Sequence, residues 1–183
     1  MGDKKQLGLA VVGCGVVGRM RAQLASDFPG IGWIGLSDTN EALGTTLKED
    51  IGADFFTTDF KELIARPEVD AVIIATSTWA HTEPTLAAVD EGHMMMIENP
   101  LATDARESAE VLAAIESAGV DAVVGYTQRF RRRFLVVKER IQTGQIGDIT
   151  AAVTRAFMNR MAPTGEVRLT QDRRFLTPMV VSG

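Results

Sequence analysis

The sequence predicts an α/β protein built on a doubly wound parallel sheet. Short apolar runs alternate with helical segments over the first 125 residues, and a glycine-rich turn follows the first run. Most of these runs are apolar almost throughout rather than at every second position. Near-continuous apolar runs are typical of strands buried on both faces of a parallel sheet. Strands and helices that alternate with short loops indicate a doubly wound sheet.

Six apolar runs are predicted to be strands. They cover residues 7–13, 31–37, 54–57, 70–75, 94–98 and 122–125.

The helices between the strands have recognisable ends. Capping boxes are predicted at Asp59 with Glu62 and at Asp104 with Glu107. Glycines stand where a left-handed residue would end a helix, at Gly52, Gly92, Gly119 and Gly144. One apolar stripe with helical spacing is predicted on the 104–118 helix, formed by Ala105, Ala109, Leu112 and Ile115.

The pattern changes after Gly125. A helix over about 128–143 is predicted to lead into a strand over about 148–158, and the last 25 residues contain no second helix. A lone helix and strand cannot bury a core of their own. We therefore expect a first domain over 1–125 and the beginning of a second α/β domain, with an open sheet, over 126–183, which is incomplete because the chain is truncated at Gly183.

Composition excludes several classes of function. The net charge of −5 argues against nucleic acid or an anionic membrane as the main partner. The single cysteine, Cys14, and two histidines leave no disulfide framework and no metal site. No run reaches the ~20 apolar residues of a membrane span, and the apolar run after Lys4 and Lys5 has no signal-peptide cleavage site. The sequence predicts a cytoplasmic protein.

The GCGVVG turn at residues 13–18 predicts a dinucleotide site. Gly13 permits a tight turn, Gly15 lets the backbone approach a diphosphate, and Gly18 lets the helix pack closely on the strand. Asp38 ends the second strand, twenty residues after Gly18, where a carboxylate can bind the adenosine ribose. Two other interpretations are a turn without a ligand and a methyltransferase, which also has a glycine-rich first turn.

Asp38 also bears on the choice of cofactor. A carboxylate repels the 2′-phosphate of NADP, and the residues that follow are Thr39, Asn40 and Glu41, with no arginine or lysine. NAD is therefore favoured over NADP.

A second cluster of polar residues follows the fourth strand. Ligands of open parallel sheets bind beyond the carboxyl ends of the strands, so we expect the cofactor cleft to be lined by Thr76, Ser77, Thr78, Trp79 and His81. For His81, a structural role at the start of a helix is an equal alternative.

These motifs, in this order, resemble the Gfo/Idh/MocA family of glucose–fructose oxidoreductases and inositol dehydrogenases. Besides the glycine turn and the strand-four loop, the chain has ENP at 98–100, where the family has Glu-Lys-Pro, and GYTQRF at 125–130, where the family has a glycine–aromatic–Asn–x–Arg–Phe element. The resemblance extends over about residues 7–147. It implies an NAD-binding Rossmann domain and a C-terminal domain that holds the substrate and forms the contacts of a homo-oligomer. The implied reaction is hydride transfer between NAD and a sugar, cyclitol or related polyol.

The resemblance implies roles for particular residues. Contacts to the cofactor are expected from Gly13, Gly15, Val16, Val17, Gly18, Asp38, Thr76, Ser77, Thr78, His81, Glu98 and Asn99. Glu98 is expected near the nicotinamide ribose, and Tyr126 and Arg129 near the substrate.

The chain departs from the family at Asn99, which replaces the lysine, and at Thr127, which replaces an asparagine. A catalytic Asp and His pair of the family would come after Gly183. Asparagine cannot carry a proton, although its amide can orient a substrate oxygen. Three hypotheses follow: an oxidoreductase whose proton carrier lies elsewhere, an NAD-using glycosidase or lyase of the same architecture, or a catalytically silent NAD-binding protein.

Overall fold

The computed structural model describes residues 6–153 and divides the chain into two compact units, Met1–Gly125 and Tyr126–Gly183. The first unit contains one six-stranded sheet, in which every pair of neighbouring strands is parallel. The strands are β1 (Leu7–Val12), β2 (Ile31–Ser37), β3 (Phe55–Thr57), β4 (Ala71–Ile74), β5 (Met94–Ile97) and β6 (Ala122–Val124). Their order is β3-β2-β1-β4-β5-β6. The predicted doubly wound sheet is confirmed.

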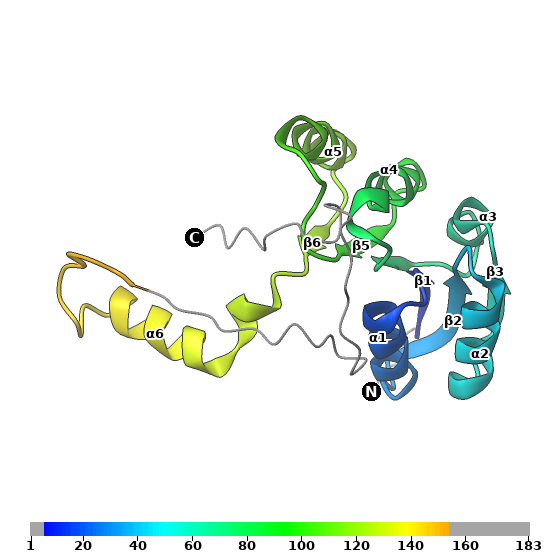
Figure 1. Ribbon diagram of the computed structural model, residues 1–183, viewed down its shortest axis with the longest axis horizontal. Helices are drawn as coiled ribbons and strands as arrows, with labels where there is room; N and C mark the ends of the chain where they lie inside the picture. The colour runs from blue at the N-terminus through cyan, green and yellow to red at the C-terminus, as the bar shows by residue number, and fades with distance from the viewer. Residues whose placement is uncertain (1–5, 154–183) are drawn as a thin grey trace, which may run out of the picture. The chain divides into compact units, whose positions relative to one another are not determined.

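Helices cover both faces of this sheet (Figure 1). One face is covered by α1 (Val16–Ser26) and α2 (Glu41–Ile51), and the other by α3 (Phe60–Ile64), α4 (Thr82–Asp90) and α5 (Ala105–Ala118). A one-turn 3₁₀ helix, η1 (Thr78–Ala80), precedes α4. This arrangement follows from right-handed crossovers, which send the chain to one face on one side of β1 and to the opposite face on the other.

The strands are buried on both faces, which explains their near-continuous apolar sequences. Along β1, Ala10 and Val12 pack into the core under α3, α4 and α5, whereas Leu9 and Val11 pack into the core under α1 and α2. All four side chains are at most 5% exposed. The two cores therefore meet at β1, the strand that the first apolar run encodes.

The predicted helix ends are confirmed in part. Asp104 accepts a hydrogen bond from the N–H of Glu107 at 2.8 Å, as the capping box requires. The Glu107 carboxylate does not return to Asp104; it accepts from the hydroxyl of Thr82 at 2.7 Å and so joins α5 to α4. The four glycines expected at helix ends all have positive φ: Gly52, Gly92, Gly119 and Gly144.

Two predictions about helices are confirmed only in part. On α5, the buried residues are Val111 and Ile115, while Leu112 is 49% exposed. Of the predicted stripe, Ile115 is buried but Ala105 and Ala109 are exposed, because alanines fit either face of a helix and Ser108 and Glu107 occupy part of the covered face. In the second unit, the helix expected over 128–143 is found as α6 (Arg132–Gln142), but its predicted first turn is a separate 3₁₀ turn, η2 (Thr127–Phe130).

The strand predicted over 148–158 is not found in its described part. Residues 148–153 form no strand, and residues 154–158 lie outside the described residues. None of the helices within 6–153 combines the length and the apolar character that crossing a membrane requires.

The N-cap of α5 allows a test of the fold. Asp104→Ala removes the acceptor for the Glu107 N–H, so we expect the free energy of unfolding to fall by about 1 kcal/mol. Asp104→Ser keeps a capping oxygen and should lose only a few tenths of that amount. Urea unfolding followed by circular dichroism measures both, and equal losses in the two variants would contradict the capping role.

Candidate functional site

The candidate site lies at the edge where the parallel strands end together. Val12 of β1 pairs with Ser37 of β2 and with Ile74 of β4, and Ile74 pairs in turn with Ile97 of β5. The hydrogen-bond ladder continues one residue further. The N–H of Gly13 donates to the carbonyl oxygen of Ser37 at 2.7 Å, and the N–H of Glu98 donates to the carbonyl oxygen of Ile74 at 2.9 Å. The predicted site residues of the first unit therefore follow strands that end at the same edge of the sheet.

The glycine turn is built from close backbone approaches. Gly13 has φ +100°, and a Cβ on it would lie 2.6 Å from the main-chain carbonyl of Ala75. A Cβ on Gly18 would overlap the carbonyl group of Gly13, so helix α1 could not pack against the turn. A Cβ on Gly15 would meet nothing within 4 Å, so the backbone at this position faces open space.

The N-terminus of α1 presents main-chain N–H groups beside this turn. Gly15 is the N-cap, and no side chain from residues 6–153 hydrogen-bonds to the cap. The first turn contains no acidic residue, and Val16 and Val17 are each 39% exposed. Unpaired N–H groups and the positive end of the helix dipole favour an anion at this position.

Asp38 is fixed against the turn by main-chain hydrogen bonds. One carboxylate oxygen accepts from the N–H of Cys14 at 2.6 Å, and the other accepts from the N–H of Asn40 at 2.8 Å. The carboxylate thus sits beside the glycine turn rather than merely ending β2. Its remaining lone pairs can accept hydroxyl groups.

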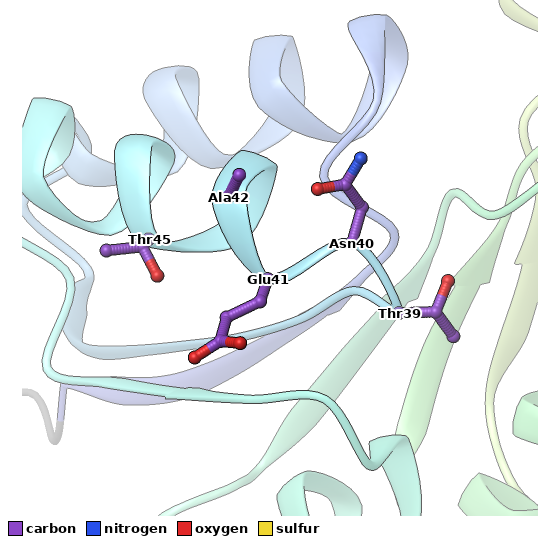
Figure 2. Close-up of a pocket in the computed structure, with 5 residues that line it drawn as sticks. All are labelled: Thr39, Asn40, Glu41, Ala42 and Thr45. Carbon is purple, nitrogen blue, oxygen red and sulfur yellow. The ribbon is translucent and has the colours of Figure 1, made fainter.

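An open pocket of about 770 Å³ adjoins Asp38 at the start of α2. It is lined by Thr39, Asn40, Glu41, Ala42 and Thr45. Figure 2 shows the Glu41 carboxylate and the Thr45 hydroxyl on the same side of the helix. Among the described residues, this lining contains one acidic residue and no basic residue.

Cys14 is a core residue inside the turn. Its side chain is 1% exposed, and its thiol lies 3.8 Å from the carbonyl oxygen of Ser37. Burial raises the pKa of the Cys14 thiol to about 12, and the nearby Asp38 carboxylate adds to the rise while Arg19 opposes it. The thiol is therefore a neutral packing group.

The strand-four loop begins at Thr76, whose hydroxyl donates to the carbonyl of Ala80 at 2.9 Å. Ser77 is exposed and Thr78 is half-buried in η1. These three residues follow the end of β4, at the point where the strand order reverses next to β1. Their contacts to a cofactor stay predictions.

His81 is buried, with 1% exposure. Its Nδ1 lies 2.7 Å from the carbonyl oxygen of Pro100, and its Nε2 lies 3.2 Å from the carbonyl oxygen of Thr76. The imidazole therefore joins the strand-four loop to the turn after β5. Its predicted cofactor contact stays a prediction, and the geometry favours an effect through the two loops that it connects.

Glu98 and Asn99 follow β5, and the Asn99–Pro100 peptide bond is cis. Both residues are half-buried. Within the described part of the chain, no hydrogen bond engages the Asn99 amide, whereas Glu98 accepts from Arg21 of α1. Arg21 was not among the predicted site residues, because no local pattern connects residues that are 77 positions apart.

Tyr126 and Arg129 belong to the second unit, which is described by itself. Arg129 lies in η2, and its N–H donates to the carbonyl of Tyr126 at 2.9 Å. Their predicted role at the substrate stays a prediction.

Comparison with known proteins identifies the family. The family model described as an oxidoreductase family with an NAD-binding Rossmann fold, Gfo/Idh/MocA, matches residues 7–126. The chain belongs to the Gfo/Idh/MocA oxidoreductase family. The matched region begins with β1 and ends directly after the glycine that follows β6.

Relatives include several inositol dehydrogenases. The inositol 2-dehydrogenase of Agrobacterium fabrum is 30% identical over 177 residues, which cover 94% of this chain and 49% of the relative. The scyllo-inositol 2-dehydrogenase (NAD⁺) of Bacillus subtilis is 29% identical over 143 residues, which cover 78% of this chain and 42% of the relative. The chain thus spans less than half the length of these relatives.

A solved structure supports the fold. The crystal structure of scyllo-inositol dehydrogenase from Lactobacillus casei, with bound NAD(H) and scyllo-inositol, superposes with a TM-score of 0.75. The match covers 80% of this chain and 44% of that chain at 22% identity.

The buried thiol of Cys14 gives a testable prediction for this site. With a pKa of about 12 rather than the ordinary 9.0, its thiolate fraction at pH 8 is about three orders of magnitude lower than that of a free thiol. We expect labelling by a disulfide reagent to be at least ~100-fold slower in the native protein than in urea. Equal labelling rates in the two conditions would contradict the buried position.

Proposed function

We propose that this chain forms the cofactor-binding part of an NAD-dependent oxidoreductase that acts on a polyol. The observation that carries the proposal is the junction of the glycine turn, the uncapped N-terminus of α1 and the Asp38 carboxylate, all joined by main-chain hydrogen bonds. Such a junction provides N–H donors for a diphosphate and an acceptor for a ribose within one rigid element.

The order of the strands supports a path for the dinucleotide across the edge. Asp38 follows β2, the turn follows β1, Thr76 lies just after β4, and Glu98 follows β5. Neighbouring strands are about 4.8 Å apart, so these positions span about 15 Å. If Asp38 holds the adenosine ribose and α1 the diphosphate, the nicotinamide half would extend over β4 and β5 toward Glu98 and Asn99.

Two carboxylates support NAD rather than NADP. Both oxygens of Asp38 are held by main-chain N–H groups, and Glu41 lines the adjoining pocket. A 2′-phosphate bound there would face negative charge without a basic partner from the pocket lining.

The chemistry requires a proton carrier as well as the cofactor. NAD supplies the hydride acceptor, and the substrate hydroxyl must lose a proton at the same time. The Asn99 amide can donate a hydrogen bond to the substrate oxygen, but it cannot take up the proton. We therefore assign Asn99 an orienting role and the proton transfer to a group outside the described residues.

The substrate class is supported by the relatives, whose names specify inositols. A cyclitol or a related polyol is the proposed substrate. Oligomerisation and a cytoplasmic location stay predictions.

Asn99 also favours a second candidate, a protein that binds NAD without net oxidation of a substrate. This candidate includes an NAD-using glycosidase or lyase as well as a silent NAD-binding protein. Both candidates bind NAD, so an activity assay rather than a binding measurement distinguishes the second candidate from the first.

The cofactor preference can be measured by calorimetry. We expect wild-type protein to bind NAD at least about tenfold more tightly than NADP, because Asp38 favours a ribose hydroxyl over a phosphate. Asp38→Asn removes the charge at nearly the same side-chain size and keeps one of the two main-chain hydrogen bonds, so the preference should fall about tenfold. Asp27→Asn, at the far end of α1, is the matched control and should leave the preference unchanged. An unchanged preference in Asp38→Asn would contradict the assignment.

The role of Asn99 can be measured by NAD reduction with a panel of cyclitols and other polyols. We expect polyol-dependent formation of NADH and no gain in turnover from Asn99→Lys, because the proton carrier lies elsewhere. A gain of about two orders of magnitude in that variant would indicate a lost function. NAD-dependent release of nitrophenol from aryl glycosides would support the second candidate, as would tight NAD binding without any reaction.

A further inference from the structure

The ion pair between Arg21 and Glu98 differs from the others in the described part of the chain. Nε and Nη2 of Arg21 lie 2.7 and 2.6 Å from the same oxygen, Oε1 of Glu98. The two side chains are 17% and 15% exposed. In the other three pairs each side chain is at least 31% exposed. Shielding from water makes this pair stronger and less sensitive to salt.

The pair connects two sides of the proposed cofactor path. Arg21 lies on α1, the helix that begins at the glycine turn, and Glu98 follows β5, two strands away from β1. Among the described residues, no other side-chain hydrogen bond or ion pair connects α1 to the end of β5, so this pair sets the position of the carboxylate relative to the helix.

The geometry leaves the second oxygen of Glu98 available. No donor from residues 6–153 reaches Oε2. On one side, the backbone of Gly125 lies so close that a Cβ there would be 3.0 Å from Oε2. Arg21 therefore holds one oxygen while the other is free to accept a hydrogen bond from a ligand.

Position 99 contributes no charge to this cluster, so Arg21 is the cation that pairs with Glu98. A guanidinium offers only hydrogen-bond donors and no acceptor. Arg21 therefore contributes charge and orientation.

We propose that Arg21 is a positioning residue, which holds Glu98 so that Oε2 accepts a hydroxyl of the nicotinamide ribose. The inference rests on the proposed function, because it requires the dinucleotide to cross the strand ends. Without Arg21, the carboxylate loses its partner and can rotate, and a partly buried charge without a partner is unfavourable. Binding of the nicotinamide half would weaken, whereas binding of the adenosine half would not.

Three nucleotides test this division in calorimetric titrations of the whole 183-residue chain. ADP contains only the adenosine and diphosphate parts, ADP-ribose adds the second ribose, and NAD adds the nicotinamide. In Arg21→Met we expect the affinities for NAD and for ADP-ribose to fall about tenfold, because a loss of this size is typical when a charge-assisted hydrogen bond is removed. Affinity for ADP should stay within about twofold, since ADP does not reach Glu98.

Matched variants separate positioning from folding. Arg21→Lys keeps the charge and should recover part of the NAD affinity. Arg106→Met removes an exposed ion pair on α5 and should change none of the three affinities. In a Glu98→Gln background, Arg21→Met should have little further effect on NAD binding, because Arg21 acts through the Glu98 carboxylate.

Several results would overturn the inference. Equal losses for ADP, ADP-ribose and NAD would show that Arg21 only stabilises the fold. Unchanged affinities in Arg21→Met would show that Arg21 does not support cofactor binding. Additive losses when Arg21→Met is combined with Glu98→Gln would show that Arg21 does not act through Glu98. Wild-type protein that binds NAD no better than ADP would exclude a contact at the second ribose while leaving the diphosphate site intact. Wild-type protein that binds neither nucleotide would overturn the proposed function as well.

Discussion

The alignment of the strand ends is the constraint on which the rest of the site depends. β1, β2, β4 and β5 end in one register, and main-chain hydrogen bonds extend that register into the loops at Gly13, Ala75 and Glu98. Main-chain hydrogen bonds therefore fix the relative positions of these strand ends without any contribution from side chains. A register shift of one residue in any strand would move its loop and turn each side chain to the opposite face.

Helix α1 and its preceding turn organise the two carboxylates of this edge. Asp38 is held by the N–H of Cys14 on one side, and Glu98 is held by Arg21 on the other. The close packing of Gly18 on Gly13 makes this possible, because it brings α1 directly onto the strand end. One element thus positions both carboxylates. In the proposed function these carboxylates would accept one ribose each, and the N–H groups of α1 would bind the diphosphate between them.

Much of the fold could be predicted from the sequence because its signals are local. Apolar runs, capping residues and glycines with positive φ each act within a few residues, and the six strands and four glycine helix ends were found from them. The buried face of α5 and the start of α6 were wrong, since both depend on packing partners rather than on periodicity. The Arg21–Glu98 pair and the burial of His81 could not be found, because they join segments that only the folded sheet brings together.

A crystal structure of this chain with NAD tests the central claim most directly. We expect the diphosphate at the N–H groups that begin α1, with the adenosine ribose hydroxyls on Asp38 and the second ribose beside Glu98. A cofactor bound away from the strand ends, or bound in the reverse direction with its nicotinamide half at Asp38, would contradict it.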